Sequence, residues 1–128
     1  MLTIFAVPLT PCRKFSMPSR DIGHLQLDAR HLWRLQDLLA RHTPEAEVWA
    51  YGSRINGKAH AGSDLDLVLR NPANLSAQCQ GWLELQDALQ ASELPMLVEV
   101  HDWAHLPAEF QRNIEQEYVV VQDAHFAP

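Results

Sequence analysis

The sequence has only two cysteines, few basic residues and no long hydrophobic run. Cys12 and Cys79 lie far apart in no metal-type spacing, which indicates free thiols in a reducing compartment and therefore a cytoplasmic protein. Lysine and arginine number 10 against 16 aspartates and glutamates, a formal net charge of −6, which argues against a general electrostatic grip on nucleic acid. No apolar run approaches the about 18–20 residues of a membrane span, so no membrane partner is expected.

The length of 128 residues, 47% of them hydrophobic, suits a single domain. Residues 1–18 contain three prolines and show neither helical nor strand periodicity, which predicts a loosely ordered N-terminal extension. Its basic pair, Arg13-Lys14, follows the apolar part, whereas a signal peptide has its basic residues first. We expect one domain over residues 19–121 and a weakly patterned tail over residues 122–128.

Apolar residues recur along this domain with helical or strand spacing. Steps of three and four between them predict helices over residues 21–42, 75–89 and 106–118. β-favouring runs predict strands over residues 48–51, 64–70 and 96–101, with a short edge strand at 119–121.

The connections between these strands predict a small mixed sheet. The turn over residues 52–63 is short for a parallel crossover, so the first two strands are expected to run antiparallel. The helix between the second and third strands is long enough for a parallel crossover. The expected fold class is therefore α/β (α+β), with a small mixed β-sheet flanked by helices.

The turn between the first two strands, together with the start of the second strand, carries the residues suited to binding or catalysis. On a strand, residues i and i+2 point to the same face, so Asp64 and Asp66 project together with about 7 Å between their Cα atoms. A hard dication such as Mg²⁺ would neutralise this pair. Across the antiparallel turn lie Gly52 and Ser53, which are expected to open a short helix whose free N–H groups suit a phosphate.

Glu99 supplies a third acid from the third strand, where it stands between two valines. Two-metal phosphoryl transfer needs such bridging carboxylates, with the two ions about 3.5–4 Å apart. The predicted reaction is in-line attack on the α-phosphorus of a nucleoside triphosphate, with release of pyrophosphate.

The string GSRINGKAHAGSDLDLVL over residues 52–69 resembles the polymerase-β-type nucleotidyltransferase superfamily, and within it the minimal nucleotidyltransferase (MNT) branch, typically written GSRARG…SDIDL. The resemblance implies the nucleotidyltransferase fold. It makes Asp64 and Asp66 metal ligands, makes Gly52 and Ser53 the triphosphate grip, and makes Arg54 a charge partner near the phosphates.

The family's third acid falls on Glu99, through the local pattern VEVHDWA where members commonly read VDLVDWA. Glutamate is one methylene longer than the usual aspartate, which is the main departure from the family pattern. Asp102, near the end of the same strand, is the alternative third acid.

The resemblance also implies a function and a partner. MNT proteins resemble one another in pairing with a separate all-helical HEPN protein, a ribonuclease toxin, as its antitoxin. The expected activity is Mg²⁺-dependent transfer of AMP from ATP to a tyrosine hydroxyl of that toxin, with two Mg²⁺ ions. Two alternatives stay open: an antitoxin that acts by binding alone, and a small-molecule (aminoglycoside-type) nucleotidyltransferase that builds its acceptor cleft as a homo-oligomer.

The same residues also allow plainer interpretations. Arg54 and Lys58 suit surface charges as well as ligands, and Glu99 suits an exposed strand position. Ser53 by itself would be a helix N-cap. His101 and His105 lie four residues apart, but no other donors accompany them as a zinc site requires.

Overall fold

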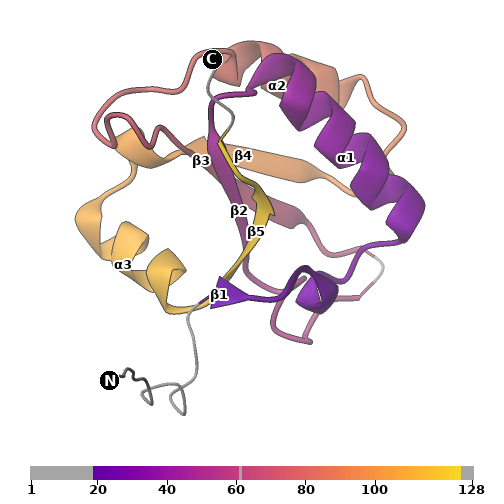
Figure 1. The fold of residues 1–128 in the computed structure, drawn as a ribbon. Helices are drawn as coiled ribbons and strands as arrows, with labels where there is room; N and C mark the ends of the chain where they lie inside the picture. The colour runs from indigo at the N-terminus through magenta and orange to yellow at the C-terminus, as the bar shows by residue number, and fades with distance from the viewer. Residues whose placement is uncertain (1–18, 61, 125–128) are drawn as a thin grey trace, which may run out of the picture.

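The computed structural model describes residues 19–60 and 62–124, so the predicted extension over 1–18 and the last residues of the predicted tail lie outside it. Figure 1 shows the arrangement of the described elements. In chain order they are β1 (Ser19–Arg20), η3 (Ile22–His24), α1 (Ala29–His42), β2 (Glu47–Tyr51), β3 (Leu65–Arg70), α2 (Trp82–Gln90), β4 (Val98–Asp102), η4 (Trp103–His105), α3 (Ala108–Gln116) and β5 (Tyr118–Gln122).

The sheet is mixed, as the connection lengths predict. Within the described residues it has five strands in the order β1-β5-β2-β3-β4. β2 and β3 pair antiparallel across the short turn, and β3 and β4 pair parallel through α2. Both predicted strand directions are confirmed, as is the α/β fold class.

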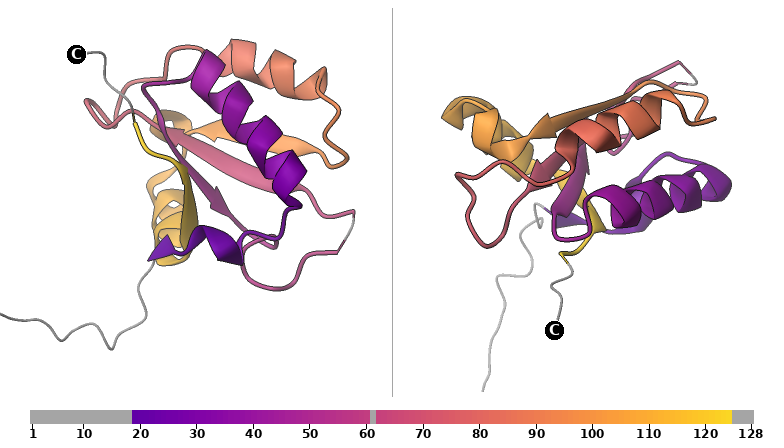
Figure 2. Two further views of the ribbon diagram at one scale, coloured as in Figure 1. Left: turned by 45° about the vertical axis from the view of Figure 1, so that its right-hand side comes forward. Right: turned by 90° about the horizontal axis from the view of Figure 1, so that it is seen from above.

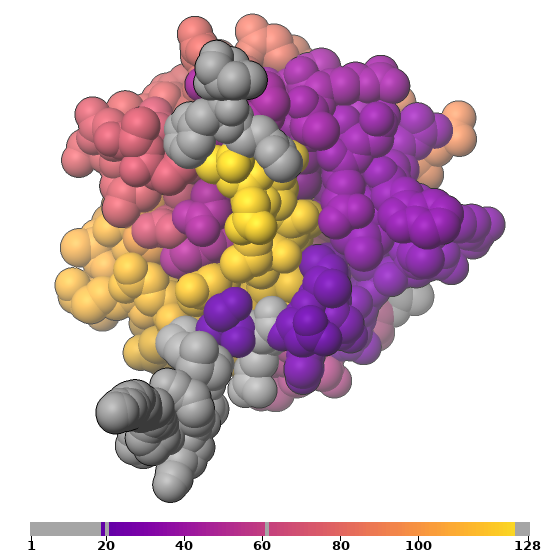
Figure 3. Space-filling view, in the orientation of Figure 1, coloured from indigo at the N-terminus to yellow at the C-terminus, as the bar shows by residue number. Residues whose placement is uncertain are grey.

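The prediction that residues 119–121 form an edge strand is wrong. β5 lies between β1 and β2, parallel to the first and antiparallel to the second. Val119 and Val121 are buried on one face, while Val120 packs on the other, so both faces of this strand are covered. β1 pairs with β5 over only two residues, and the chain of β5 is visible at the surface in Figure 3.

The first predicted helix starts later than its apolar spacing indicates. Residues 22–24 form a separate 3-10 turn, and α1 begins at Ala29. Asp28 caps it, because its Oδ1 accepts a hydrogen bond from the backbone N–H of Arg30 at 2.9 Å. Leu25, predicted on the helix, is buried without being helical.

The second predicted helix is likewise shorter, since α2 begins at Trp82 and not near residue 75. The Oδ1 atom of Asn74 accepts a hydrogen bond from the backbone N–H of Ser76 at 3.0 Å, and such local side-chain bonds compete with helix formation. Gly81 then adopts φ +87°, a left-handed conformation that interrupts a helix. Leu75 is consequently 41% exposed, whereas Cys79 is buried although it lies in an irregular segment. The third strand begins two residues later and ends one residue later than predicted, and the last helix is two residues shorter at each end.

The sheet separates two apolar clusters, with α1 and α2 over one face and α3 over the other (Figure 2). Leucines 65, 67 and 69 of β3 pack toward α1 and α2. On the α3 face, Trp49, Val68, Trp103 and Ile114 form a smaller cluster. Among the described helices, each is too short or too polar to cross a lipid bilayer.

Candidate active site

The predicted acids Asp66 and Glu99 are brought together by strand register. Asp66 lies opposite Tyr51 on β2 and opposite Glu99 on β4. Residues directly opposite on neighbouring strands point to the same face, which here is the face that α3 partly covers. Asp64, exposed, immediately precedes β3. We refer to Asp64, Asp66 and Glu99 as the acid cluster.

Folding changes the electrostatics of Asp66. Partial burial raises the pKa of its carboxyl, and the negative charges of Glu99 and Asp64 raise it further, while His101 acts in the opposite direction. Burial also raises the pKa of the neighbouring Tyr51 phenol, with a further contribution from Asp66 and Glu99. The acid cluster therefore concentrates negative charge at one edge of a partly desolvated surface.

Asp102, the alternative third acid, lies on the opposite face of the sheet. It is 2% exposed, and its Oδ1 accepts a hydrogen bond from the backbone N–H of Cys79 at 3.0 Å. The bond holds the segment before α2 against β4. Of the two acids considered for the third position, the structure places only Glu99 beside Asp66.

Gly52 is required by the close approach of Asp66. Its φ of +87° favours glycine, and a Cβ at this position would lie 2.8 Å from Oδ2 of Asp66. Ser53 follows directly in the turn. The expectation that Gly52 and Ser53 open a helix is wrong: residues 53–57 form turns, with the N–H of Ile55 donating to the Gly52 carbonyl at 3.1 Å. Burial of Ile55 draws this loop back into the core before a helix extends.

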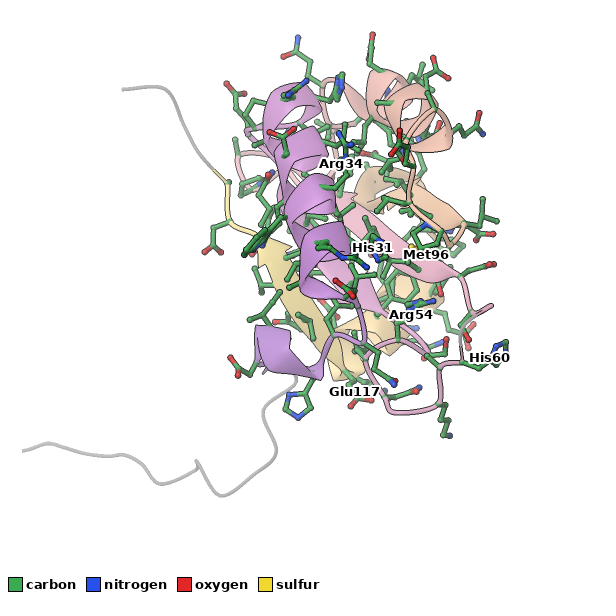
Figure 4. All side chains as sticks on the ribbon, turned by 90° about the vertical axis from the view of Figure 1, so that its right-hand side faces the viewer. His31, Arg34, Arg54, His60, Met96 and Glu117 are labelled. Atoms are coloured by element: carbon green, nitrogen blue, oxygen red, sulfur yellow. The ribbon has the colours of Figure 1, made fainter. Side chains whose placement is uncertain are left out.

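Arg54, predicted to lie near the phosphates, holds this loop in place through hydrogen bonds of its side chain. It is 8% exposed, with its Nε donating to the Ser63 carbonyl at 3.1 Å and its Nη1 to the Gln26 carbonyl at 2.7 Å. These bonds join both ends of the loop to the segment before α1. Arg54 extends toward the body of the molecule, whereas His60 lies at the outside of the loop (Figure 4). A contact of Arg54 with phosphate stays a prediction.

The acid cluster has the chemistry of a magnesium site without a closed set of ligands. Within residues 19–60 and 62–124, no group of three or more histidine, cysteine, aspartate or glutamate side chains is gathered closely enough to hold a metal ion. Oε1 of Glu99 lies 3.9 Å from Nε2 of His101. The donors nevertheless suit Mg²⁺ in kind, because all three are carboxylates, whose oxygen atoms this ion prefers.

The zinc alternative at His101 and His105 receives no support from their surroundings. The ring of His101 faces Phe110 on the α3 side, with 6.2 Å between ring centroids. The ring of His105 packs instead against Trp82 of α2, at 5.4 Å. The two imidazoles are therefore engaged with different helices.

A cavity of about 380 Å³ adjoins Gly52 between the turn and α3. Apart from Gly52, sequence reasoning assigned none of its residues to the site, because Phe110 fits the apolar spacing of the last helix. The position of Tyr51 directly before the Gly-Ser turn was the available signal. A larger hollow of about 680 Å³ lies near the end of α1 and shares no residue with the acid cluster. The smaller cavity is lined by Tyr51, Gly52, Asn56, Phe110, Asn113, Ile114, Gln116 and Glu117.

Comparisons with known proteins identify similar sequences and a similar fold. The sequence profile of the family described as "Polymerase beta, Nucleotidyltransferase" matches residues 34–125. The chain is 34% identical over 103 residues to the "Probable protein adenylyltransferase MntA" of Haemophilus influenzae, covering 80% of this chain and 89% of that protein. A solved structure described as "Crystal structure of the toxin-antitoxin with AMP-PNP" superposes with a TM-score of 0.56 at 18% identity, covering 74% of this chain and 73% of that one.

Proposed function

Because the chain belongs to the polymerase beta nucleotidyltransferase family, we propose that it transfers AMP from ATP to a protein hydroxyl, as the antitoxin of a toxin–antitoxin pair. The observation that carries the proposal is the register of β3 and β4, which sets Asp66 beside Glu99 next to the glycine turn. Carboxylates on adjacent strands beside a glycine turn suit a metal-bound polyphosphate.

The relatives support the two parts of this proposal to different degrees. The similarity to a probable protein adenylyltransferase extends over 89% of that protein, so it concerns the whole relative and not one segment. The toxin–antitoxin structure shares the fold at low identity, and that complex contains an ATP analogue. AMP as the transferred group and a toxin as partner are consistent with both.

In the proposed reaction, the acceptor hydroxyl oxygen forms a bond to the α-phosphorus of ATP. The bond from that phosphorus to the β-phosphate breaks, pyrophosphate leaves, and the hydroxyl proton passes to solvent. Asp64, Asp66 and Glu99 would hold Mg²⁺, which when bound lowers the charge on the phosphates and on the attacking oxygen. Gly52 and Ser53 would orient the phosphates through backbone N–H groups and the serine hydroxyl.

We place the acceptor on a separate protein, a tyrosine of a helical HEPN-type toxin, as the MNT resemblance implies. In this proposal the described residues bind the nucleotide, and the acceptor approaches over the part of the sheet beside the acid cluster that α3 leaves uncovered. We also place the reaction in the cytoplasm, where ATP and Mg²⁺ are available; the free, buried Cys79 is consistent with a reducing compartment.

The test is label transfer from α-³²P-ATP to the protein encoded by the neighbouring gene, in Mg²⁺ buffer. We expect the wild-type protein to label its neighbour and Asp66→Asn to lose at least about 100-fold in rate, since the site loses a charged ligand. Asp87→Asn removes an exposed carboxylate from α2 and serves as the matched control. Absence of wild-type label, or equal labelling by Asp66→Asn, would exclude the proposed activity.

A second candidate function is neutralisation by binding alone. The open arrangement of the acid cluster favours it, as does the glutamate at position 99. ATP affinity with and without Mg²⁺ separates the candidates. Metal-dependent tightening supports the enzyme, whereas toxin binding without metal-dependent ATP binding supports the second candidate.

A further inference from the structure

The cavity beside Gly52 differs in chemistry from the acid cluster it adjoins. Its walls combine two aromatic rings, those of Tyr51 and Phe110, with the carboxamides of Asn56, Asn113 and Gln116. Among its lining residues, all of which the structure describes, there is no lysine or arginine. A phosphate group would lack a cation there, whereas a flat, uncharged, hydrogen-bonding group would find both stacking surfaces and amides.

Phe110 links this cavity to the acid cluster. Its ring meets that of Tyr51 edge-on, with centroids 6.0 Å apart and planes at 86°, and it also lies 6.2 Å from the ring of His101. Tyr51 stands on β2 and His101 on β4, so Phe110 reaches over β3, the strand that carries Asp66. Although it belongs to an amphipathic helix, Phe110 remains 36% exposed. An aromatic ring is thus left partly open next to the acids.

The size and position of the cavity suit the nucleoside part of a nucleotide. Its volume of about 380 Å³ falls within the range of about 300–1,000 Å³ typical of small-molecule sites. Gly52 borders both the cavity and Asp66, so a ligand with phosphates at the turn has its other end directed along α3.

From this arrangement we propose that the cavity is the adenine site: the base packs against Phe110 and Tyr51, and Asn113 of α3 recognises it through its carboxamide. The inference rests on the proposed function, which makes ATP the substrate, and adds the residues that select the base. A carboxamide both donates and accepts, so it pairs with the amino group and adjacent ring nitrogen of adenine. This discrimination applies on the edge that carries N7: adenine presents the N6 amino donor and the N7 acceptor there, whereas guanine presents two acceptors, O6 and N7, so the same two-bond pairing fails.

The experiment measures ATP and GTP affinity by calorimetry, and AMP transfer to the partner, for wild-type protein and variants. For Phe110→Ala we expect ATP binding to weaken about tenfold, the loss usual for a stacking ring, with KM rising more than kcat falls. For Asn113→Ala we expect the preference for ATP over GTP to shrink about tenfold. Leu83→Ala and Gln90→Ala, exposed positions on α2, are the matched controls and are expected to match wild type.

The outcomes separate this inference from the proposed function. Wild-type transfer with unchanged ATP affinity and unchanged base preference in both cavity variants overturns the adenine site and leaves the proposed function standing. Weakened ATP binding in the variants without any wild-type transfer supports the adenine site and removes the proposed function. If wild-type protein binds neither nucleotide, both fall. Asn113 is exposed, so its variant keeps the test valid should Phe110→Ala fail to fold.

Discussion

At the scale of one residue, the ionised carboxylate of Asp66 lowers the stability of the folded state. Its carboxyl is half-buried beside Glu99 and Asp64, and its pKa is raised first by burial and then by those charges. An acid with a raised folded-state pKa destabilises the folded state whenever it is ionised, because the unfolded chain carries the same charge at lower free energy. The proposed metal-binding role of Asp66 therefore requires a charge that the fold itself disfavours.

We predict that Asp66→Asn makes the metal-free protein more stable at neutral pH while removing activity. The penalty from ionised Asp66 is fully present above its folded-state pKa, declines as pH falls through that pKa, and is absent below the ordinary value of 3.8. Urea unfolding in EDTA between pH 3.5 and 8 should show a gain in the variant that shrinks toward low pH. The control Asp87→Asn should show little change, and a variant less stable than wild type at pH 7 would contradict the account.

At the scale of elements, the packing of α1 against the start of α2 depends on one glycine. Gly81 directly precedes α2 and has φ +87°, and a Cβ there would lie 1.9 Å from the carbonyl oxygen of His42, the last residue of α1. That distance is far below van der Waals contact. Any side chain at this position would therefore force the two helices apart and disturb the segment that also contains Cys79.

We predict that Gly81→Ala lowers the free energy of unfolding by about 3 kcal/mol or more, combining left-handed strain of about 1 kcal/mol with overpacking of about 1–3 kcal/mol. Gly57→Ala is the matched control, because Gly57 has φ +82° with nothing within 4 Å of its added Cβ. This control should lose only the strain, about 1 kcal/mol. Equal losses in urea unfolding for the two variants would show that the contact with His42 is unimportant.

At the scale of the whole molecule, the two faces of the sheet differ in how completely helices cover them. The face toward α1 and α2 holds the larger apolar cluster, and Asp102 is buried on it as a hydrogen-bond acceptor. The other face is covered by α3 over one part only, which leaves Asp66 partly buried and Glu99 exposed. On this face the Arg70 guanidinium stacks on the Trp49 ring at 4.0 Å and forms an ion pair with Glu47. The Arg70 side chain therefore contributes to packing as well as to ion pairing.

This division predicts opposite phenotypes for two acids of the same strand. Glu99→Gln should reduce AMP transfer at least about 100-fold while changing stability by no more than about 0.5 kcal/mol, as an exposed position allows. Asp102→Ala should lower stability by about 1–3 kcal/mol, because the N–H of Cys79 loses its buried acceptor, with transfer kept within about threefold at 15 °C. Rates and urea unfolding of both variants check this, and exchanged phenotypes would reverse the assignment.

Local patterns accounted for much of the fold. The alternation of leucines with Asp66, Val68 and Arg70 predicted β3 to within one residue, and the short turn predicted its antiparallel pairing with β2. Helix boundaries were less accurate, since the cap at Asp28 and the conformation of Gly81 outweighed the apolar spacing. The place of β5 depended on a partner strand distant in sequence, which no local pattern contains.

By itself, the sequence determined the pairing of a glycine turn with two carboxylates, because turn and strands are neighbours in the chain and their geometry is local. Tertiary structure alone decided the remainder of the site. The parallel register of β4 against β3 set Glu99, and not Asp102, beside Asp66. The packing of α3 brought Phe110 to Tyr51 and formed the cavity. These relations join segments far apart in the chain, so only the balance of burial over the whole sheet selects them.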